Sequence, residues 1–254
     1  MIRAITIGAL SVTAALLALC DPAGAAEIKA LSVTSMKPAL EQLMPEFERA
    51  TGHKVVVGYG TPGDITQRLF KRGEVCDMIL IGRGDIARLV KDKKITDSLS
   101  VARTGYGVAV KKGAPHPDVS TPDALKKALL AAKSIAQPSL ARGGAAAFTV
   151  QRVFARLRIT DQIQAKLKFA PGKVQVSTLV ANGTAEIGVQ RMPELMSDPG
   201  VDVIGPLPDR LQEITEITAG LTAASKQPDA VRALARHLTS AEAKAVYKEQ
   251  GLGL

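Results

Sequence analysis

Short runs of β-branched and aliphatic residues alternate with amphipathic helical stretches along almost the whole chain, and this rhythm limits the fold more than any other feature. In the first such unit, a strand-like run at 28–33 is followed by apolar residues at the spacing of one helix face. These residues are Leu40, Leu43, Met44 and Phe47. Strands separated by helices in this order pair in parallel, with the helices covering the sheet. The sequence therefore predicts an α/β fold.

The same pattern recurs to the end of the chain. Further strands are predicted at 54–57, 78–81, 106–110, 134–136, 173–176, 187–190, 201–204 and 214–221. Helices are predicted at 65–71, 121–132, 145–157, 229–238 and 241–249. Pro45 lies inside the first helical pattern, where we expect a kink or a turn. No internal repeat and no low-complexity linker is present, so a chain with two lobes would cross between them within strands.

The first 26 residues have the order of a secretory signal peptide. A basic residue, Arg3, precedes an apolar run at 5–19, and small residues follow at 23–26. The apolar run is shorter than the roughly 20 residues that a membrane span requires. We therefore expect export to the periplasm and cleavage near Ala26. A retained membrane anchor and a lipid attached to Cys20 stay open as alternatives.

The predicted mature chain is basic. Removal of residues 1–26 takes away one basic and one acidic residue, so the net charge stays at +9. Basic charge attracts nucleic acid, an anionic membrane surface or an anionic solute. Export argues against nucleic acid. The chain also has no Trp and only 3% aromatic residues, whereas single-strand binders stack bases on aromatic rings. We expect no nucleic-acid partner.

No arrangement of residues in the sequence favours an enzyme. The three histidines, His53, His116 and His237, have no Cys or carboxylate at metal-ligand spacing. The sequence also lacks a G-x-S-x-G turn and a phosphate-loop lysine motif. Cys76 would be the only cysteine after export, and we expect it in the core rather than as a nucleophile. We therefore expect no enzymatic activity, no metal and no cofactor, and an exported enzyme stays as the less favoured alternative.

Three turns that lead from a predicted strand into a predicted helix are candidates for a ligand site. They lie at 34–38 (TSMKP), 58–64 (GYGTPGD) and 142–146 (RGGAA). Ser35 and Thr61 are each placed to cap the following helix, and Asp64 completes a capping-box pattern with Thr61. Helix starts also bind anions, and in open α/β sheets they gather beyond the carboxyl ends of the strands. Plain capping is the alternative for each turn alone, but the three together favour a shared anion site.

Six short segments spread over the chain match one known family. They are LSVTSMKPAL (31–40), FERATGHKV (47–55), YGT (59–61), AVKKGAP (109–115), AEIG (185–188) and GPLP (205–208). With these segments the chain resembles the molybdate-binding group of type II periplasmic binding proteins. The resemblance implies two lobes, each a mixed sheet flanked by helices, joined by two crossover strands. Lobe 1 would comprise 27–107 and 206–254, and lobe 2 would comprise 108–205.

The resemblance also implies how a solute is held between the lobes. In the molybdate binders, hydroxyls and backbone amides hold the oxyanion. Ser35, beside Thr34, matches the first hydroxyl position, and Thr61 matches the second, where a Ser is usual. The turn with Gly144 and Ala145 matches the third position, which contributes backbone groups.

The fourth and fifth positions are less regular. Ser177 lies close to the fourth. At the fifth a Tyr is expected after the strand at 187–189, and here Gln190 and Arg191 stand instead. Gln190 can donate to an anion, while Arg191 and Arg142 are candidate charge partners for a carboxylate. The expected ligand is therefore a molybdate-like oxyanion, with a small organic carboxylate as the alternative.

The resemblance finally implies a partner. We expect a monomer that binds a small anionic solute and delivers it to the permease of an ABC-type importer. A binding protein that reports to a sensor is the alternative, because both roles use the same closed form.

Overall fold

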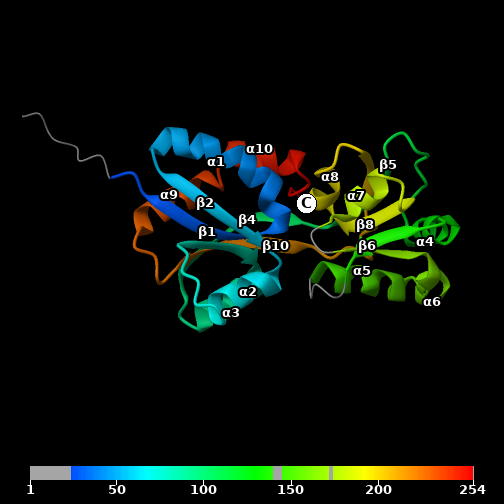
Figure 1. The fold of residues 1–254 in the computed structure, drawn as a ribbon, viewed down its shortest axis with the longest axis horizontal. Coiled ribbons are helices and arrows are strands. Elements are labelled where there is room, and N and C mark those ends of the chain that lie inside the picture. Colours follow the sequence, from blue (N-terminus) through cyan, green and yellow to red (C-terminus); the bar gives the residue numbers. More distant parts are fainter. Residues whose placement is uncertain (1–23, 140–144, 172–173, 254) are drawn as a thin grey trace, which may run out of the picture.

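The structure, a computed structural model, describes residues 24–139, 145–171 and 174–253. Its strands form two five-stranded sheets that lie one after the other along the longest axis of the molecule (Figure 1). Helices flank both sheets, and each sheet mixes parallel and antiparallel pairs. This confirms the predicted two-lobed α/β fold. Below, lobe 1 is the half with the first sheet and lobe 2 the half with the second.

Lobe 1 contains the strand order β2-β1-β3-β10-β4. The bounds are β1 Glu27–Val33, β2 Lys54–Gly60, β3 Met78–Gly82, β4 Ile95–Thr104 and β10 Thr215–Thr222. β1 is parallel to β2 and β3, whereas β10 is antiparallel to β3 and β4. One face is covered by α1 (Lys37–Thr51), α9 (Pro228–His237) and α10 (Ala241–Glu249), and the other by α2 (Pro62–Phe70) and α3 (Arg83–Lys91) (Figure 1).

The α1 helix buries the predicted apolar face, since Leu40, Leu43, Met44 and Phe47 are all buried. The helix continues through Pro45 to Thr51, so a turn at this residue is wrong, while a kink there stays a prediction. Pro45 is exposed. A proline inside a helix costs about 3 kcal/mol, whereas each large apolar side chain buried gains about 1.5–3 kcal/mol. The four buried side chains therefore outweigh the proline.

Lobe 2 contains the strand order β7-β6-β8-β5-β9. The bounds are β5 Tyr106–Lys111, β6 Ile135–Pro138, β7 Leu167–Ala170, β8 Ile187–Arg191 and β9 Val201–Pro206. Its helices are α4 (Pro122–Ala131), α5 (Ala145–Arg156), α6 (Thr160–Ile163), α7 (Val176–Ala181) and α8 (Met192–Met196). Figure 1 shows α5 and α6 on one side of this sheet and α7 and α8 on the other. The described residues also contain two short 3-10 turns, η1 (Thr34–Met36) and η3 (Gln164–Lys166).

The sequence predictions of secondary structure were incomplete. The helices α3, α6 and α8 and the strand β4 were not predicted. The β4 segment, ITDSLSVART, is mostly exposed over its first half and has little apolar alternation to reveal it. The strand predicted at 173–176 is wrong in its described part, because Val176 begins α7, while the neighbouring strand lies earlier, at Leu167–Ala170.

Two segments connect the lobes. The first is direct, since only Gly105 separates β4 from β5. The second runs through 207–214 from β9 to β10. The lobe boundaries at 107/108 and 205/206 stay a prediction; β5 and β9, on which they fall, pair with each other in the second sheet.

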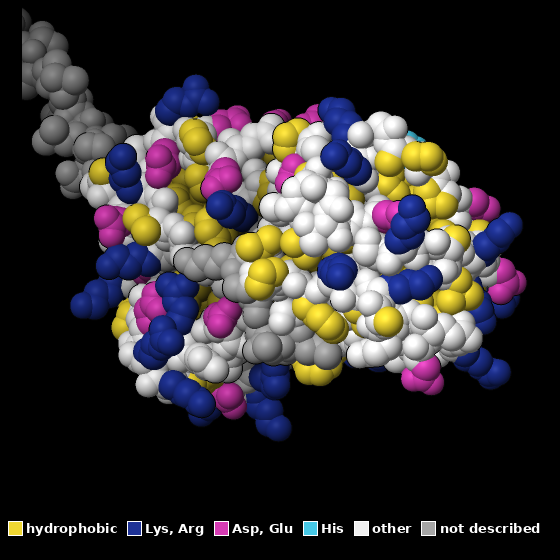
Figure 2. Space-filling view, turned by 45° about the vertical axis from the view of Figure 1, so that its right-hand side comes forward, with side chains coloured by type: hydrophobic (Ala, Val, Ile, Leu, Met, Phe, Trp, Pro, Cys, Tyr) yellow, Lys and Arg dark blue, Asp and Glu magenta, His cyan; other side chains and the backbone are white. Residues whose placement is uncertain are grey.

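The surface and core agree with the composition. Cys76 is buried as predicted, and burial raises the pKa of its thiol to about 12. Lys and Arg side chains are distributed over both lobes on the face that Figure 2 presents. Within the described ranges, no helix is both long and apolar enough to cross a membrane.

Candidate ligand-binding site

Two adjoining cavities lie between the lobes. The larger has a volume of about 150 Å³ and the smaller about 70 Å³. Four residues line both cavities: Thr34, Thr61, Ala146 and Glu194. Cavities of about 210 and 440 Å³ also occur, but only lobe 1 lines them. The two inter-lobe cavities are therefore the candidate cleft, and they lie where β1, β2 and β3 end.

Ser35 lines the larger cavity, but it does not act as the predicted helix cap. It lies in η1, and the N-cap position of α1 is taken by Met36 without a side-chain hydrogen bond. Ser35 is 4% exposed, and among the described residues its hydroxyl has no hydrogen-bond partner. The hydroxyl can therefore bond to water or to a ligand in the cavity.

Thr61, in contrast, forms the predicted capping box. Its hydroxyl accepts a hydrogen bond from the backbone N of Asp64 at 3.2 Å and donates to Asp64 Oδ2 at 2.7 Å. The Asp64 carboxylate also accepts from the backbone N of Thr61 at 2.9 Å. The neighbouring hydroxyl of Thr34 donates to the carbonyl of Gly60 at 3.3 Å. Both threonine hydroxyls therefore already have partners within the protein.

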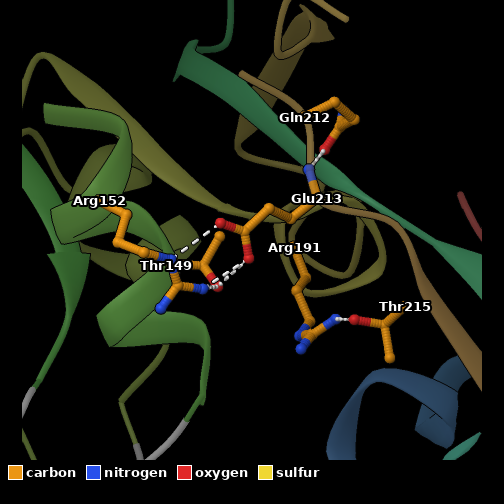
Figure 3. Close-up of polar contacts among 6 residues, drawn as sticks. All are labelled: Thr149, Arg152, Arg191, Gln212, Glu213 and Thr215. Atoms are coloured by element: carbon orange, nitrogen blue, oxygen red, sulfur yellow. Dashed lines mark hydrogen bonds and ion pairs between the residues drawn. The ribbon is translucent and has the colours of Figure 1, made fainter. Parts of the chain in front are cut away.

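Arg191 enters the larger cavity from lobe 2. It is the last residue of β8 and the N-cap of α8, and it is half-buried. Its Nη1 donates to Thr215 Oγ1 at 3.0 Å, across the lobe boundary (Figure 3). The guanidinium lies 5.0 Å from the centre of the Tyr106 ring, opposite Arg191 in the β5–β8 pair. Among the described residues Arg191 forms no ion pair, although Asp85 and Glu194 line the same cavity.

Gln190 lies next to Arg191, but its amide is fully used inside lobe 2. Its Oε1 accepts from the backbone N of Val176 at 3.1 Å. Its Nε2 donates to Gln175 Oε1 at 3.1 Å and to Glu194 Oε2 at 3.0 Å. Gln190 is 6% exposed. These bonds fasten α7 and α8 to β8, so Gln190 acts here as a support for the cleft wall.

The remaining predicted site residues are placed as follows. Ser177 is buried in α7, lines neither cleft cavity, and donates to the carbonyl of Glu194 at 3.1 Å. Ala145 begins α5, and the next residue, Ala146, lines both cavities. Arg142 and Gly144 lie outside the described residues.

The cleft also contains groups that the sequence reading missed. Ser139 and Gln175 line the smaller cavity, while Asp85 and Thr215 line the larger one. Neither the Ser139 hydroxyl nor Gln175 Nε2 donates a hydrogen bond within the described chain. Gln175 lies two residues before Ser177, which matches a position of the family pattern, but no motif of its own distinguishes Gln175.

Behind Arg191, a polar network fixes the second connecting segment. Glu213 accepts from Arg152 Nε at 2.9 Å, from Arg152 Nη2 at 2.5 Å and from Thr149 Oγ1 at 3.1 Å (Figure 3). The hydrogen bonds from Arg152 hold the pKa of Glu213 below its usual range. Gln212 accepts from the Tyr106 backbone N at 2.8 Å and donates to the Tyr106 carbonyl at 2.9 Å. The network thus ties the two lobe connections to each other and to α5.

The chemistry of the cleft is that of a binding site for a small polar solute. It combines hydroxyls, the amides of Gln175 and Gln190 and a guanidinium, and its acidic residues are Asp85 and Glu194. In the described ranges, no group of three His, Cys, Asp or Glu side chains is arranged to hold a metal ion.

Comparisons with known proteins agree with this arrangement. The chain matches the family of bacterial extracellular solute-binding proteins over residues 28–253. An aconitate isomerase of a Pseudomonas species is 31% identical over 229 residues, which cover 87% of this chain and 86% of that protein. The molybdate-binding protein ModA of Azotobacter vinelandii is 29% identical over 242 residues, covering 91% and 92%.

Solved structures agree on the fold. The periplasmic molybdate-binding protein of Azotobacter vinelandii has a TM-score of 0.71 and 18% identity, covering 89% of this chain and 99% of that one. The family description also agrees with the predicted export, while cleavage near Ala26 stays a prediction. The chain belongs to the bacterial extracellular solute-binding proteins, in the molybdate-binding-like group with the type II fold.

Proposed function

We propose that this protein captures a small anion in the cleft between its lobes and delivers it to the permease of an ABC-type importer. One observation carries the proposal: the Ser35 hydroxyl of lobe 1 and the Arg191 guanidinium of lobe 2 line the same cavity. Ser35 has no hydrogen-bond partner and Arg191 has no ion pair among the described residues. An anion between them would satisfy both groups at once.

Lobe closure follows from the same geometry. A ligand that touches only one lobe binds the open and closed forms equally and shifts nothing. An anion that touches Ser35 and Arg191 together binds the closed form better, so binding favours closure. The connecting segments at Gly105 and 207–214 are the places where the lobes can rotate.

A molybdate-like oxyanion is the first candidate ligand. The relative ModA is named for molybdate, and Thr34 and Ser35, at the start of η1, line the larger cavity. Unpaired N–H groups at helix starts favour oxyanions.

An organic carboxylate is the second candidate, and Arg191 favours it. A guanidinium presents a planar fork of N–H groups that matches a carboxylate bidentately. The relative named aconitate isomerase is named for an organic acid. Delivery to a sensor instead of a permease would use the same cleft.

We propose that the bound solute leaves unchanged. Since one relative carries an enzyme name, this is tested by incubating the protein with cis- or trans-aconitate and following the vinyl protons by NMR. No change over a day at stoichiometric protein is the expected result, whereas interconversion of the isomers would contradict it.

The binding proposal is tested by thermal unfolding of the mature protein with sulfate, molybdate and small carboxylates. A ligand at 1,000 times its Kd stabilises by about 4 kcal/mol. For a chain of this size this raises the unfolding midpoint by roughly 8–16 °C. The Ser35→Ala variant should show a smaller shift with the same ligand. If none of the anions shifts the midpoint, the proposed function is wrong.

A further inference from the structure

The free donors of the cleft fall into two groups. Ser35 and Arg191 line the larger cavity, and Ser139 and Gln175 line the smaller one. Thr34, Thr61, Ala146 and Glu194 line both cavities, so the two groups are neighbours within one cleft. The hydroxyls of Thr34 and Thr61, between the two groups, are already bonded to Gly60 and Asp64.

The two groups differ in charge as well as in position. The larger cavity has a guanidinium that is held from behind by the Tyr106 ring and from the side by Thr215. This fixed orientation presents its remaining N–H groups to the cavity. The smaller cavity offers neutral donors, the hydroxyl of Ser139 and the amide nitrogen of Gln175. Gln175 is fixed through its Oε1, which accepts from Gln190 Nε2 at 3.1 Å.

A tetrahedral oxyanion has all its acceptors around one atom. Placed against Arg191 and Ser35, it leaves the donors of the smaller cavity unsatisfied. Placed in the smaller cavity, it leaves the guanidinium uncompensated. Either choice leaves one set of donors to water and loses its contribution to binding. A ligand with separate acceptor groups on a short carbon skeleton can satisfy both sets at the same time.

The hydrogen bonds of Gln190 also favour a ligand with separate acceptor groups over a tetrahedral oxyanion. At the position where the molybdate-binding group is expected to offer a Tyr, this chain has an amide whose oxygen and nitrogen are both used internally. No donor is left there for an oxyanion. The charge on this wall comes from the next residue, Arg191, whose fork suits a planar carboxylate.

We infer that the cleft selects an organic acid with at least two carboxylates, one on Arg191 and Ser35 and a second on Ser139 and Gln175. The inference rests on the proposed function, because it names the ligand class for the same cleft. The first contact is charge-assisted and supplies most of the affinity. The second contact supplies selectivity for chain length and for the number of carboxylates.

Calorimetric titration with a matched ligand series tests this inference. The series is butyrate, glutarate and propane-1,2,3-tricarboxylate, with one, two and three carboxylates, beside sulfate and molybdate. We expect the tricarboxylate or glutarate to bind at least 100-fold more tightly than butyrate and than either inorganic anion. Equal affinity for glutarate, tricarboxylate and butyrate, or tighter binding of molybdate or sulfate, would overturn the inference while leaving the proposed anion-binding function intact.

Two variants separate the two contacts. Arg191→Gln should lower affinity for every carboxylate, by at least 30-fold for the diacid and triacid. Ser139→Ala should lower affinity for the diacid and triacid about 5- to 10-fold and leave butyrate unchanged. Ser120→Ala, at an exposed serine before α4, is the matched control and should change none of these values. If Ser139→Ala weakens butyrate as much as the diacid, the second carboxylate position is refuted. If no anion binds the wild-type protein at all, the proposed function itself fails.

Discussion

The two faces of the cleft handle their polar groups in different ways. On the lobe 1 face, Thr34 and Thr61 give their hydroxyls to neighbouring protein atoms, and Ser35 alone is left without a partner among the described residues. On the lobe 2 face, Gln190 is bonded at every polar atom, while Arg191 forms no ion pair with a described residue. The segments that match the molybdate-binding group most clearly lie on the first face. The lobe 2 face differs from that group at Gln190 and Arg191, and Arg191 adds a positive charge.

This difference separates shared architecture from ligand choice. The lobe 1 face consists of turns between strands and helices, which any anion can use through backbone N–H groups. The lobe 2 face presents a planar cation, which discriminates between anion shapes. We therefore expect changes on lobe 2 to alter which ligand binds, and changes on lobe 1 to alter how tightly any ligand binds.

Charge reversal at Arg191 should have the largest effect. Arg191→Glu places a carboxylate where the anion binds, so we expect affinity to fall more than 1,000-fold for every anion. Arg191→Lys keeps the charge but loses the fork, so it should reduce the preference for carboxylates over oxyanions. Calorimetric titration measures both. Arg232→Glu, on α9 away from the cleft, is the control and should bind normally. Normal binding by the Arg191→Glu variant would show that Arg191 does not line the ligand site.

Ser35→Ala should come next. The hydroxyl has no partner among the described residues, so its loss should leave the unfolding midpoint within about 1–2 °C of wild type. A hydrogen bond to a charged ligand contributes about 1.5–3 kcal/mol, so affinity should fall roughly 10- to 100-fold for all anions alike. Titration and thermal unfolding on one preparation measure the two effects. A large loss of stability without a loss of affinity would show that Ser35 stabilises the fold and does not contact the ligand.

Thr61→Ala should show the opposite balance. Its hydroxyl caps α2 through Asp64, and loss of such a cap costs about 1 kcal/mol of stability. This corresponds to a fall of roughly 2–4 °C in the unfolding midpoint. Affinity should change much less than in Ser35→Ala. Thr61→Ser, which keeps the capping oxygen, should restore the midpoint. If Thr61→Ala instead loses affinity as strongly as Ser35→Ala, the two hydroxyls are equivalent and the contrast within lobe 1 is wrong.

The Glu213 network should give the smallest effect, and it should depend on pH. The pKa of Glu213 is lowered in the folded protein, first by hydrogen bonds from Arg152. Its contribution to stability is therefore present above the unfolded glutamate pKa of about 4.3 and is lost as pH falls through the lower folded value. Because the pair is partly exposed, this contribution should stay below about 1 kcal/mol.

The Glu213→Gln variant tests the direction of this dependence. At pH 7.5 its unfolding midpoint should lie slightly below that of wild type, and the difference should shrink as pH falls below 4. Glu46→Gln, at an exposed position of α1, controls for the general effect of removing a carboxylate. A difference that grows on acidification would show that the ionised carboxylate destabilises the folded chain.

Sequence reasoning correctly predicted the features that depend on residues three or four positions apart in the chain. The strand and helix rhythm, the buried face of α1 and the capping box at Thr61 all rest on such spacings, and the structure confirms each. The same reasoning was wrong where tertiary packing overrode a local rule. Pro45 does not interrupt α1, because the buried side of the helix is the stronger effect, and Ser35 does not cap it.

The roles in the cleft depended on contacts between distant residues. The side-chain oxygen of Gln190 accepts a hydrogen bond from the backbone N of Val176, 14 residues away. The guanidinium of Arg191 donates to the hydroxyl of Thr215, 24 residues away. Gln212 joins the two lobe connections across 106 residues. By itself the sequence determined the α/β class, the turns of the proposed anion site and the family resemblance. Only the tertiary structure decided which of the polar groups are already satisfied and which are left for a ligand, because hydrogen-bond saturation is set by the partners that folding brings together.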